Sequence, residues 1–162
     1  MEEIYKEYSK IVYIYLISFT NNAELAEELM QETFYSAMKN INKFRNESSL
    51  KTWLCRIAKN KWLDYLKKVK TSTEVGIDEI DEKFLLVNSF EDAYSDRDNV
   101  IDLYKKIHKL DEKFREVVYL RIIADLSFKE IGQIMGESEN WSRVTFYRAK
   151  IKLKEEFKDG EK

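Results

Sequence analysis

Apolar side chains recur at every third or fourth position along most of this chain of 162 residues. That spacing is typical of α-helices with one buried face, and it predicts helices near residues 4–19, 25–41 and 49–68. The same pattern returns near residues 96–109 and 111–124 and in a final pair within 126–157. Because the chain has four glycines and no proline, few tight turns can be built, and we predict an all-α fold.

Polar residues that favour helix ends interrupt this pattern. Asn21 and Asn22 fall between the first two predicted helices, and either Ser48 or Ser49 is placed to cap the third. Asparagine and serine side chains accept hydrogen bonds from the free amides of a helix N-terminus. The boundaries of the first three helices are therefore predicted by specific residues as well as by the apolar spacing.

The final pair of predicted helices has the pattern of a helix-turn-helix. Ser127 and Glu130 form an S-x-x-E capping box before a short helix, and Gly136 lies where a tight turn needs a positive φ angle. The expected core face of the following helix holds Val144 or Trp141, then Ala149, then Ile151 or Leu153.

The opposite face of that last helix is basic, with Arg143, Tyr147, Arg148, Lys150, Lys152 and Lys154. A helix of this kind fits the major groove of DNA, with its N-terminal residues over the base edges. The alternative is an ordinary helical hairpin whose basic face is solvated. The turn glycine, the capping box and the basic face together favour DNA binding.

Charge is segregated along the chain, although the net charge is only −2. Residues 43–70 have nine basic and two acidic side chains (+7), residues 71–102 have two and ten (−8), and residues 103–162 have fourteen and eleven (+3). We therefore predict two small helical domains, residues 1–70 and 96–162, joined by an acidic linker, residues 71–95. The local basic segments keep nucleic-acid binding possible despite the acidic balance.

Composition excludes several other classes of protein. No apolar run approaches the roughly 18 residues of a membrane span, and the most apolar stretch, residues 11–19, lacks the basic lead of a signal peptide. A single cysteine, Cys55, rules out an internal disulfide. We expect a soluble, cytoplasmic protein.

The sequence contains no catalytic constellation. The only histidine, His108, is expected on a helix surface, and Cys55 is expected to be buried and unreactive. There is no C-x-x-C, H-E-x-x-H or P-loop motif, and the carboxylates of residues 78–82 lack EF-hand spacing. We expect no enzymatic activity, no cofactor and no metal site.

Two surfaces in the first half have a distinctive composition. Glu28, Gln31 and Glu32 belong to an acidic stripe that extends beyond the first helical turn, where the helix dipole would favour acids. Residues 44–68 form a polar loop and a helix that mixes aromatic with basic side chains, which suits unpaired nucleic acid. Because Trp53 and Trp62 share the apolar face, we place both rings in the core and assign phosphate contacts to the cations.

Two stretches of the chain resemble one protein family. Residues 26–34 are A-E-E-L-M-Q-E-T-F, and residues 53–60, W-L-C-R-I-A-K-N, are followed by Asp64. This combination resembles region two of the extracytoplasmic-function (ECF) sigma factors, the small two-domain members of the sigma-70 family. Residues 110–153 resemble region four, including R-A-K at 148–150. The two stretches occur in the family's order and cover most of the chain.

The resemblance implies that the protein binds core RNA polymerase, recognises promoter DNA and helps to melt it. Contacts with the polymerase clamp helices would come from Glu28, Gln31 and Glu32, and the second domain would also dock on the flap. Contacts with the minus-ten element would come from Asn46, Glu47, Ser48, Ser49, Lys51, Arg56, Lys59 and Asn60. Contacts with the minus-35 element would come from Asn140, Ser142, Arg143, Tyr147, Arg148 and Lys150.

The resemblance also implies a cognate anti-sigma factor, which could be anchored in the membrane, and a linker that runs through the RNA-exit path. Asn140 and Trp141 replace the small residues usual ahead of the recognition helix, so the promoter sequence is not implied. The alternative function is a stand-alone helix-turn-helix regulator. That alternative explains residues 126–157 but neither the acidic stripe nor the +7 segment.

Overall fold

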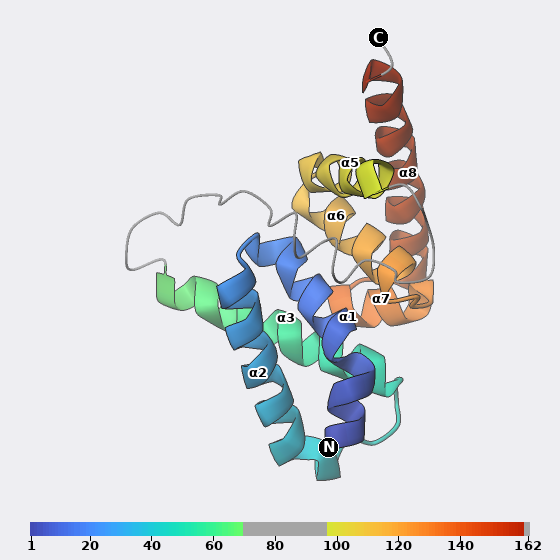
Figure 1. Cartoon of the computed structure of the whole chain (residues 1–162). Coiled ribbons are helices and arrows are strands. Elements are labelled where there is room, and N and C mark those ends of the chain that lie inside the picture. The colour runs from blue at the N-terminus through green and yellow to red at the C-terminus, as the bar shows by residue number, and fades with distance from the viewer. Residues whose placement is uncertain (70–96, 161–162) are drawn as a thin grey trace. The chain divides into compact units, whose positions relative to one another are not determined.

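The computed structural model describes residues 1–69 and 97–160, with side chains from residue 102 to residue 156 in the second stretch. Every regular element within these two stretches is helical (Figure 1). The chain divides into two compact units, Met1–Ile80 and Asp81–Lys162. The prediction of an all-α fold with two domains is confirmed, whereas the predicted linker, residues 71–95, lies outside the described residues.

The first unit is built from three helices, α1 (Glu2–Thr20), α2 (Ala23–Asn40) and α3 (Leu50–Val69), and each packs against the other two (Figure 1). A short 3₁₀ turn, Ile41–Lys43, follows α2. Apolar side chains from all three helices fill the core, including Tyr15, Leu16, Ala26, Leu54 and Ala58. Cys55 is buried beside them, as predicted.

The ends of these helices are formed by the residues that the sequence indicates. Asn21 ends α1 in the left-handed conformation, with φ of 49°. The Asn22 side chain accepts a hydrogen bond of 3.1 Å from the amide of Leu25. At the start of α3 the Ser49 hydroxyl accepts a hydrogen bond of 3.1 Å from the amide of Thr52, so Ser49 rather than Ser48 is the cap.

The second unit contains α5 (Arg97–Lys109), α6 (Glu112–Val118), a wider π-helical turn (Tyr119–Ile123), α7 (Phe128–Met135) and α8 (Glu139–Gly160). The long helix α8 packs against α5, α6 and α7 (Figure 1). Its contacts enclose a second core that includes Val117, Leu120, Leu126, Ile131 and Ala149. Within the described residues, no helix is both long and apolar enough to cross a membrane.

His108 is partly buried in this unit, so the prediction of a surface histidine is wrong. Its Nε2 lies 3.1 Å from the Tyr119 hydroxyl, and Arg115 donates a hydrogen bond of 3.2 Å to the His108 carbonyl. Burial, followed by the positive charge of Arg115, lowers the pKa of His108 to about 4. The helical pattern alone missed this because the ring packs against the π-helical turn, at Tyr119.

Candidate polymerase and DNA interfaces

The helix-turn-helix begins with the predicted capping box. The Ser127 hydroxyl accepts from the Glu130 amide at 3.1 Å, and the Glu130 carboxylate accepts from the Ser127 amide at 2.9 Å. Gly136 ends α7 with φ of 69°, a conformation that favours glycine. The capping box and the turn glycine are therefore both confirmed.

The close approach of α7 and α8 depends on Gly132, which the sequence pattern did not single out. The amide of Glu137 donates a hydrogen bond of 2.9 Å to the carbonyl oxygen of Gly132. A Cβ atom at position 132 would lie 2.6 Å from the Glu137 carbonyl oxygen and 3.1 Å from that of Ser138. Glycine at this position leaves room for the chain that starts α8.

Five of the six residues predicted to contact the minus-35 element are exposed on α8: Asn140, Arg143, Tyr147, Arg148 and Lys150. The sixth, Ser142, is fully buried instead, and its hydroxyl donates a hydrogen bond of 3.1 Å to the Ser138 carbonyl, so its side chain is not exposed for a base contact. It lies on the packed face of α8 with Thr145, Phe146, Ala149 and Leu153, all of them buried.

The core alternatives for α8 are resolved by the same packing. Leu153 is buried and Ile151 is 58% exposed, while Trp141 is half-buried and Val144 is 37% exposed. Two branched apolar residues thus lie on the solvent side. Small or polar residues at positions 142, 145 and 149 occupy the packed face instead, which hides the helical period from the sequence pattern.

The ring of Phe128, at the start of α7, packs against two arginine side chains and so helps to orient the exposed Arg143. The guanidinium carbons of Arg121 and Arg143 lie 4.2 and 5.4 Å from the centre of its ring. Arg121 is fixed further by a hydrogen bond of 2.9 Å to the Leu126 carbonyl, and Arg143 pairs with Glu139 at 3.2 Å. Arg143 therefore projects from a defined position near the N-terminal end of α8. The sequence pattern did not single out Phe128 either.

In the first unit, the predicted minus-ten residues surround the loop before α3. Asn46, Glu47 and Ser49 are exposed and Ser48 is half-buried, with Asn46 at φ of 57°. On α3, Arg56 and Asn60 are exposed while Lys51 and Lys59 are half-buried. The loop and this face of α3 offer hydrogen-bonding groups and cations in one continuous stretch of chain.

The two tryptophans of α3 lie at the edge of the core. Trp53 is half-buried, with its ring centre 5.1 Å from that of Phe44. Trp62 is also half-buried and stacks between Phe19 and Tyr65, at 5.8 and 5.7 Å. Both rings pack against neighbouring aromatic side chains, in keeping with the predicted structural role, although neither is fully enclosed.

The acidic stripe on α2 is exposed along its whole length. Glu28, Gln31 and Glu32 face solvent, opposite the buried residues of the same helix. Tyr35 and Met38 continue the stripe and are 55% and 50% exposed.

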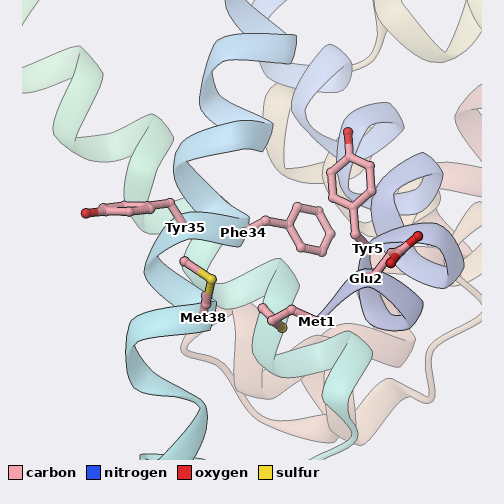
Figure 2. Close-up of a pocket in the computed structure, with 6 residues that line it drawn as sticks. All are labelled: Met1, Glu2, Tyr5, Phe34, Tyr35 and Met38. Carbon is pink, nitrogen blue, oxygen red and sulfur yellow. The ribbon is translucent and has the colours of Figure 1, made fainter.

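Tyr35 and Met38 also line an apolar pocket of about 320 Å³ with Met1, Glu2, Tyr5 and Phe34. Figure 2 shows these side chains, which come from the start of α1 and the second half of α2. The rings of Tyr5 and Phe34 meet edge to face at 4.9 Å. One face of α2 therefore combines carboxylates with exposed apolar area.

These features define a protein of two helical modules, the second of which ends in a helix-turn-helix. Comparison with known families gives two matches, sigma-70 region 2 over residues 4–71 and sigma-70 region 4 over residues 101–153. The ECF RNA polymerase sigma factor SigM of Bacillus subtilis (strain 168) is 30% identical, covering 99% of this chain and 96% of SigM. RNA polymerase sigma factor YlaC of the same organism is 29% identical, covering 95% of this chain and 90% of YlaC. The chain belongs to the ECF sigma factors of the sigma-70 family.

Solved structures with a similar fold include the sigma factor RpoE in complex with the anti-sigma factor NepR from Bartonella quintana. That chain matches with a TM-score of 0.77 at 22% identity, covering 97% of this chain and 96% of RpoE. CnrH, in complex with the cytosolic domain of CnrY, matches with a TM-score of 0.69 at 20% identity, covering 98% and 87%. Both comparisons support the fold, and the presence of both sigma regions disfavours a stand-alone helix-turn-helix regulator.

Proposed function

We propose that this chain is a promoter-recognition subunit, which binds core RNA polymerase, directs it to a set of promoters and helps to melt the DNA there. The observation that carries the proposal is the presence of both sigma-70 regions, in order, in one chain. Residues 1–70 form the first functional module and residues 96–162 the second. Residues 71–95, which are acidic in sequence and lie outside the described residues, connect them.

The polymerase-binding residues in this proposal are Glu28, Gln31 and Glu32. Positions three and four apart are neighbours on a helix, so the three side chains form one patch. Their exposure supports the assignment, because a carboxylate patch repels DNA phosphates and attracts a protein surface with basic side chains. The proposed target is the pair of clamp helices of the largest subunit.

The minus-ten element is assigned to the loop before α3 and to the helix that follows. Asn46, Glu47 and Ser48 are the candidates to bind an unpaired base, since hydrogen-bonding groups on a loop can reach its edge. The Ser49 hydroxyl is already engaged as the cap of α3, so its contact would be made through the backbone. The polar and basic residues of α3 then contact the strand: Lys51, Arg56, Lys59 and Asn60.

The minus-35 element is assigned to the exposed residues of α8, namely Asn140, Arg143, Tyr147, Arg148 and Lys150. Arginine can bind guanine through two hydrogen bonds and asparagine can bind adenine in the same way. The cluster at Phe128 supports a base contact for Arg143 in particular, because it limits the positions of that guanidinium. The second module would also dock on the polymerase flap.

A cognate anti-sigma factor is proposed as the regulatory partner, since the structural relatives RpoE and CnrH are described in complexes with NepR and with the cytosolic domain of CnrY. Such a partner could be anchored in the membrane and hold the chain there. We further propose that the chain works in the cytoplasm, where RNA polymerase is found, and that it has no enzymatic activity of its own.

Transcription from genomic DNA by purified core polymerase tests the proposal. Core enzyme free of other sigma factors is mixed with the chain, and the 5′ ends of the transcripts are sequenced. The expected result is a set of start sites, absent without the chain, that share sequence elements near minus-ten and minus-35. A chain that binds duplex DNA as a dimer but adds no start sites would overturn the proposal in favour of a plain regulator.

A further inference from the structure

The solvent-facing side of α8 carries a branched apolar side chain, Val144, near its N-terminal end. Val144 is 37% exposed, whereas the buried face of the same helix is made by Ser142, Thr145, Phe146, Ala149 and Leu153. Single apolar residues are common on protein surfaces, so exposure alone has no meaning. The side chains around Val144 and its position in the helix indicate a function for its exposure.

Val144 lies among side chains that can form hydrogen bonds. Asn140 is four positions before it, Tyr147 is three positions after it and Arg148 four after it, and all three are exposed. Residues three and four apart are adjacent on a helix, so these three side chains are neighbours of Val144, together with the half-buried Trp141 three positions before it. The exposed neighbours of Val144 are therefore hydrogen-bonding side chains, one of them basic, and that setting favours DNA over a protein partner.

The position of Val144 along α8 also matters. It lies five residues after Glu139, the first residue of the helix. In a helix-turn-helix the N-terminal part of the second helix contacts base edges in the major groove. Ile151 is more exposed, at 58%, but lies seven residues further on, which is roughly 10 Å along the helix axis. Of the two exposed aliphatic residues of α8, Val144 is therefore the one that lies within the base-contacting part of the helix.

Base edges in the major groove present hydrogen-bond donors and acceptors and one apolar group, the 5-methyl group of thymine. We propose that Val144 contacts the 5-methyl group of a thymine in the minus-35 element and is a specificity-determining residue of α8. This inference rests on the proposed function and adds to it one contact with defined chemistry. The neighbouring polar side chains would bind the flanking bases or phosphates.

Deoxyuridine differs from thymidine only by that methyl group, which allows a direct test. Each thymine of the minus-35 element is replaced in turn, and binding of reconstituted holoenzyme to the promoter is measured. At one position the wild-type protein is expected to bind about fourfold more weakly, the factor that corresponds to ~0.8 kcal/mol for a buried methyl or methylene group. Holoenzyme with Val144→Ala should bind the thymine promoter about fourfold more weakly than wild type does. Replacing that thymine by deoxyuridine should not weaken binding of the variant any further.

Two further variants sharpen the result. Val144→Ile keeps an apolar side chain and should keep the preference for thymine. Ile151→Ala makes a comparable truncation on the same helix, outside the proposed contact, and should retain the full response to deoxyuridine. All variants should have the helical circular-dichroism signal of the wild type, since the substituted side chains are exposed.

Three outcomes would overturn the inference. In the first, no thymine in the element responds to loss of its methyl group. In the second, Val144→Ala responds to deoxyuridine as strongly as the wild type does. In the third, Val144→Ala weakens binding to all DNA equally, as a protein-docking residue would. Each of these outcomes is compatible with promoter-specific initiation by the wild-type protein, so it would contradict the Val144 contact and not the proposed function. If the wild-type protein directed no promoter-specific initiation at all, both the contact and the proposed function would be overturned.

Discussion

Replacing Gly132 by alanine is expected to destabilise the second unit, although alanine is the better helix former by about 1 kcal/mol. The new Cβ would lie 2.6 Å from the Glu137 carbonyl oxygen and 3.2 Å from the Ser138 carbonyl carbon. These are backbone atoms of the two residues just before α8, and they cannot rotate away as a side chain would. Overpacking of this kind costs about 1–3 kcal/mol, and we expect about 2–3 kcal/mol here because backbone atoms must move. After the helix-propensity gain of about 1 kcal/mol is subtracted, the free energy of unfolding should fall by about 1–2 kcal/mol.

Trp141 makes this measurable in the full chain. Of the three tryptophans, at positions 53, 62 and 141, only Trp141 belongs to the second unit. In a background with phenylalanine at positions 53 and 62, the fluorescence of Trp141 follows unfolding of that unit in guanidinium chloride. Gly132→Ala should lower the midpoint and leave the slope unchanged.

Gly136 supplies the matched control, since it lies four residues away and requires glycine for a different reason. A Cβ at position 136 meets no atom within 4 Å, but φ is +69°. Gly136→Ala should also cost about 1–2 kcal/mol, whereas Gly136→Asn should recover part of it because asparagine tolerates the left-handed conformation. Gly132→Asn should recover nothing. Equal stability of Gly132→Ala and wild type would refute the steric argument.

Three further predictions concern binding and pH. Charge reversal at Glu28 and Glu32 should weaken pull-down of core polymerase without changing the helical circular-dichroism signal, and wild-type pull-down by a folded variant would contradict the assignment. Arg143→Ala in holoenzyme should cost about 1–3 kcal/mol on duplex promoter and relax specificity at one position, so equal binding to all single-base variants by both proteins would count against it. Because the pKa of His108 falls from 6.5 unfolded to about 4 folded, the unfolded state binds the proton more tightly, and stability should fall as pH drops from about 6.5 to about 4. The Trp141 unfolding midpoint measured across that range should depend less on pH in His108→Gln, and parallel profiles would exclude the histidine as the cause.

The helices and their ends could be predicted because they depend on local chemistry. Asn22, Ser49 and Ser127 cap helices through their own side chains, within three residues of the amides they bind. Such contacts are encoded in a few consecutive residues. The apolar spacing likewise gave the number and order of the helices on either side of the residues that the structure does not describe.

The burial of Ser142 and the exposure of Val144 on α8 could not be predicted, because they depend on how this helix packs against the rest of its unit. Gly132 leaves room for the backbone of Glu137 and Ser138 just before α8, and Ser142, one helical turn after Ser138, is fully buried. A serine on the packed face and a valine on the exposed face reverse the usual order of hydrophobicity. The partial burial of His108 has the same origin, since its partner Tyr119 is eleven residues away and on a turn of unusual pitch.

The features of the candidate contact surfaces likewise divide into those that follow from local sequence and those that depend on packing between segments. Exposure of the acidic stripe on α2 follows from helical periodicity, and the structure agrees with it. The orientation of Arg143 does not follow from periodicity, because it depends on Phe128 in the preceding helix and, through that ring, on Arg121. Contacts that join three separate segments are beyond a pattern that considers one helix at a time.

The turn between α1 and α2 is a place where a single substitution could raise the stability of the first unit. Asn21 adopts a left-handed conformation that glycine would adopt more easily, and its Oδ1 atom is buried without a hydrogen-bond partner in the described structure. Asn21→Gly would remove both costs, against a smaller loss from the greater freedom of the unfolded chain. The residue is outside every proposed contact surface. The stability gained by this substitution could therefore offset the loss from destabilising substitutions elsewhere, including ones that alter promoter choice.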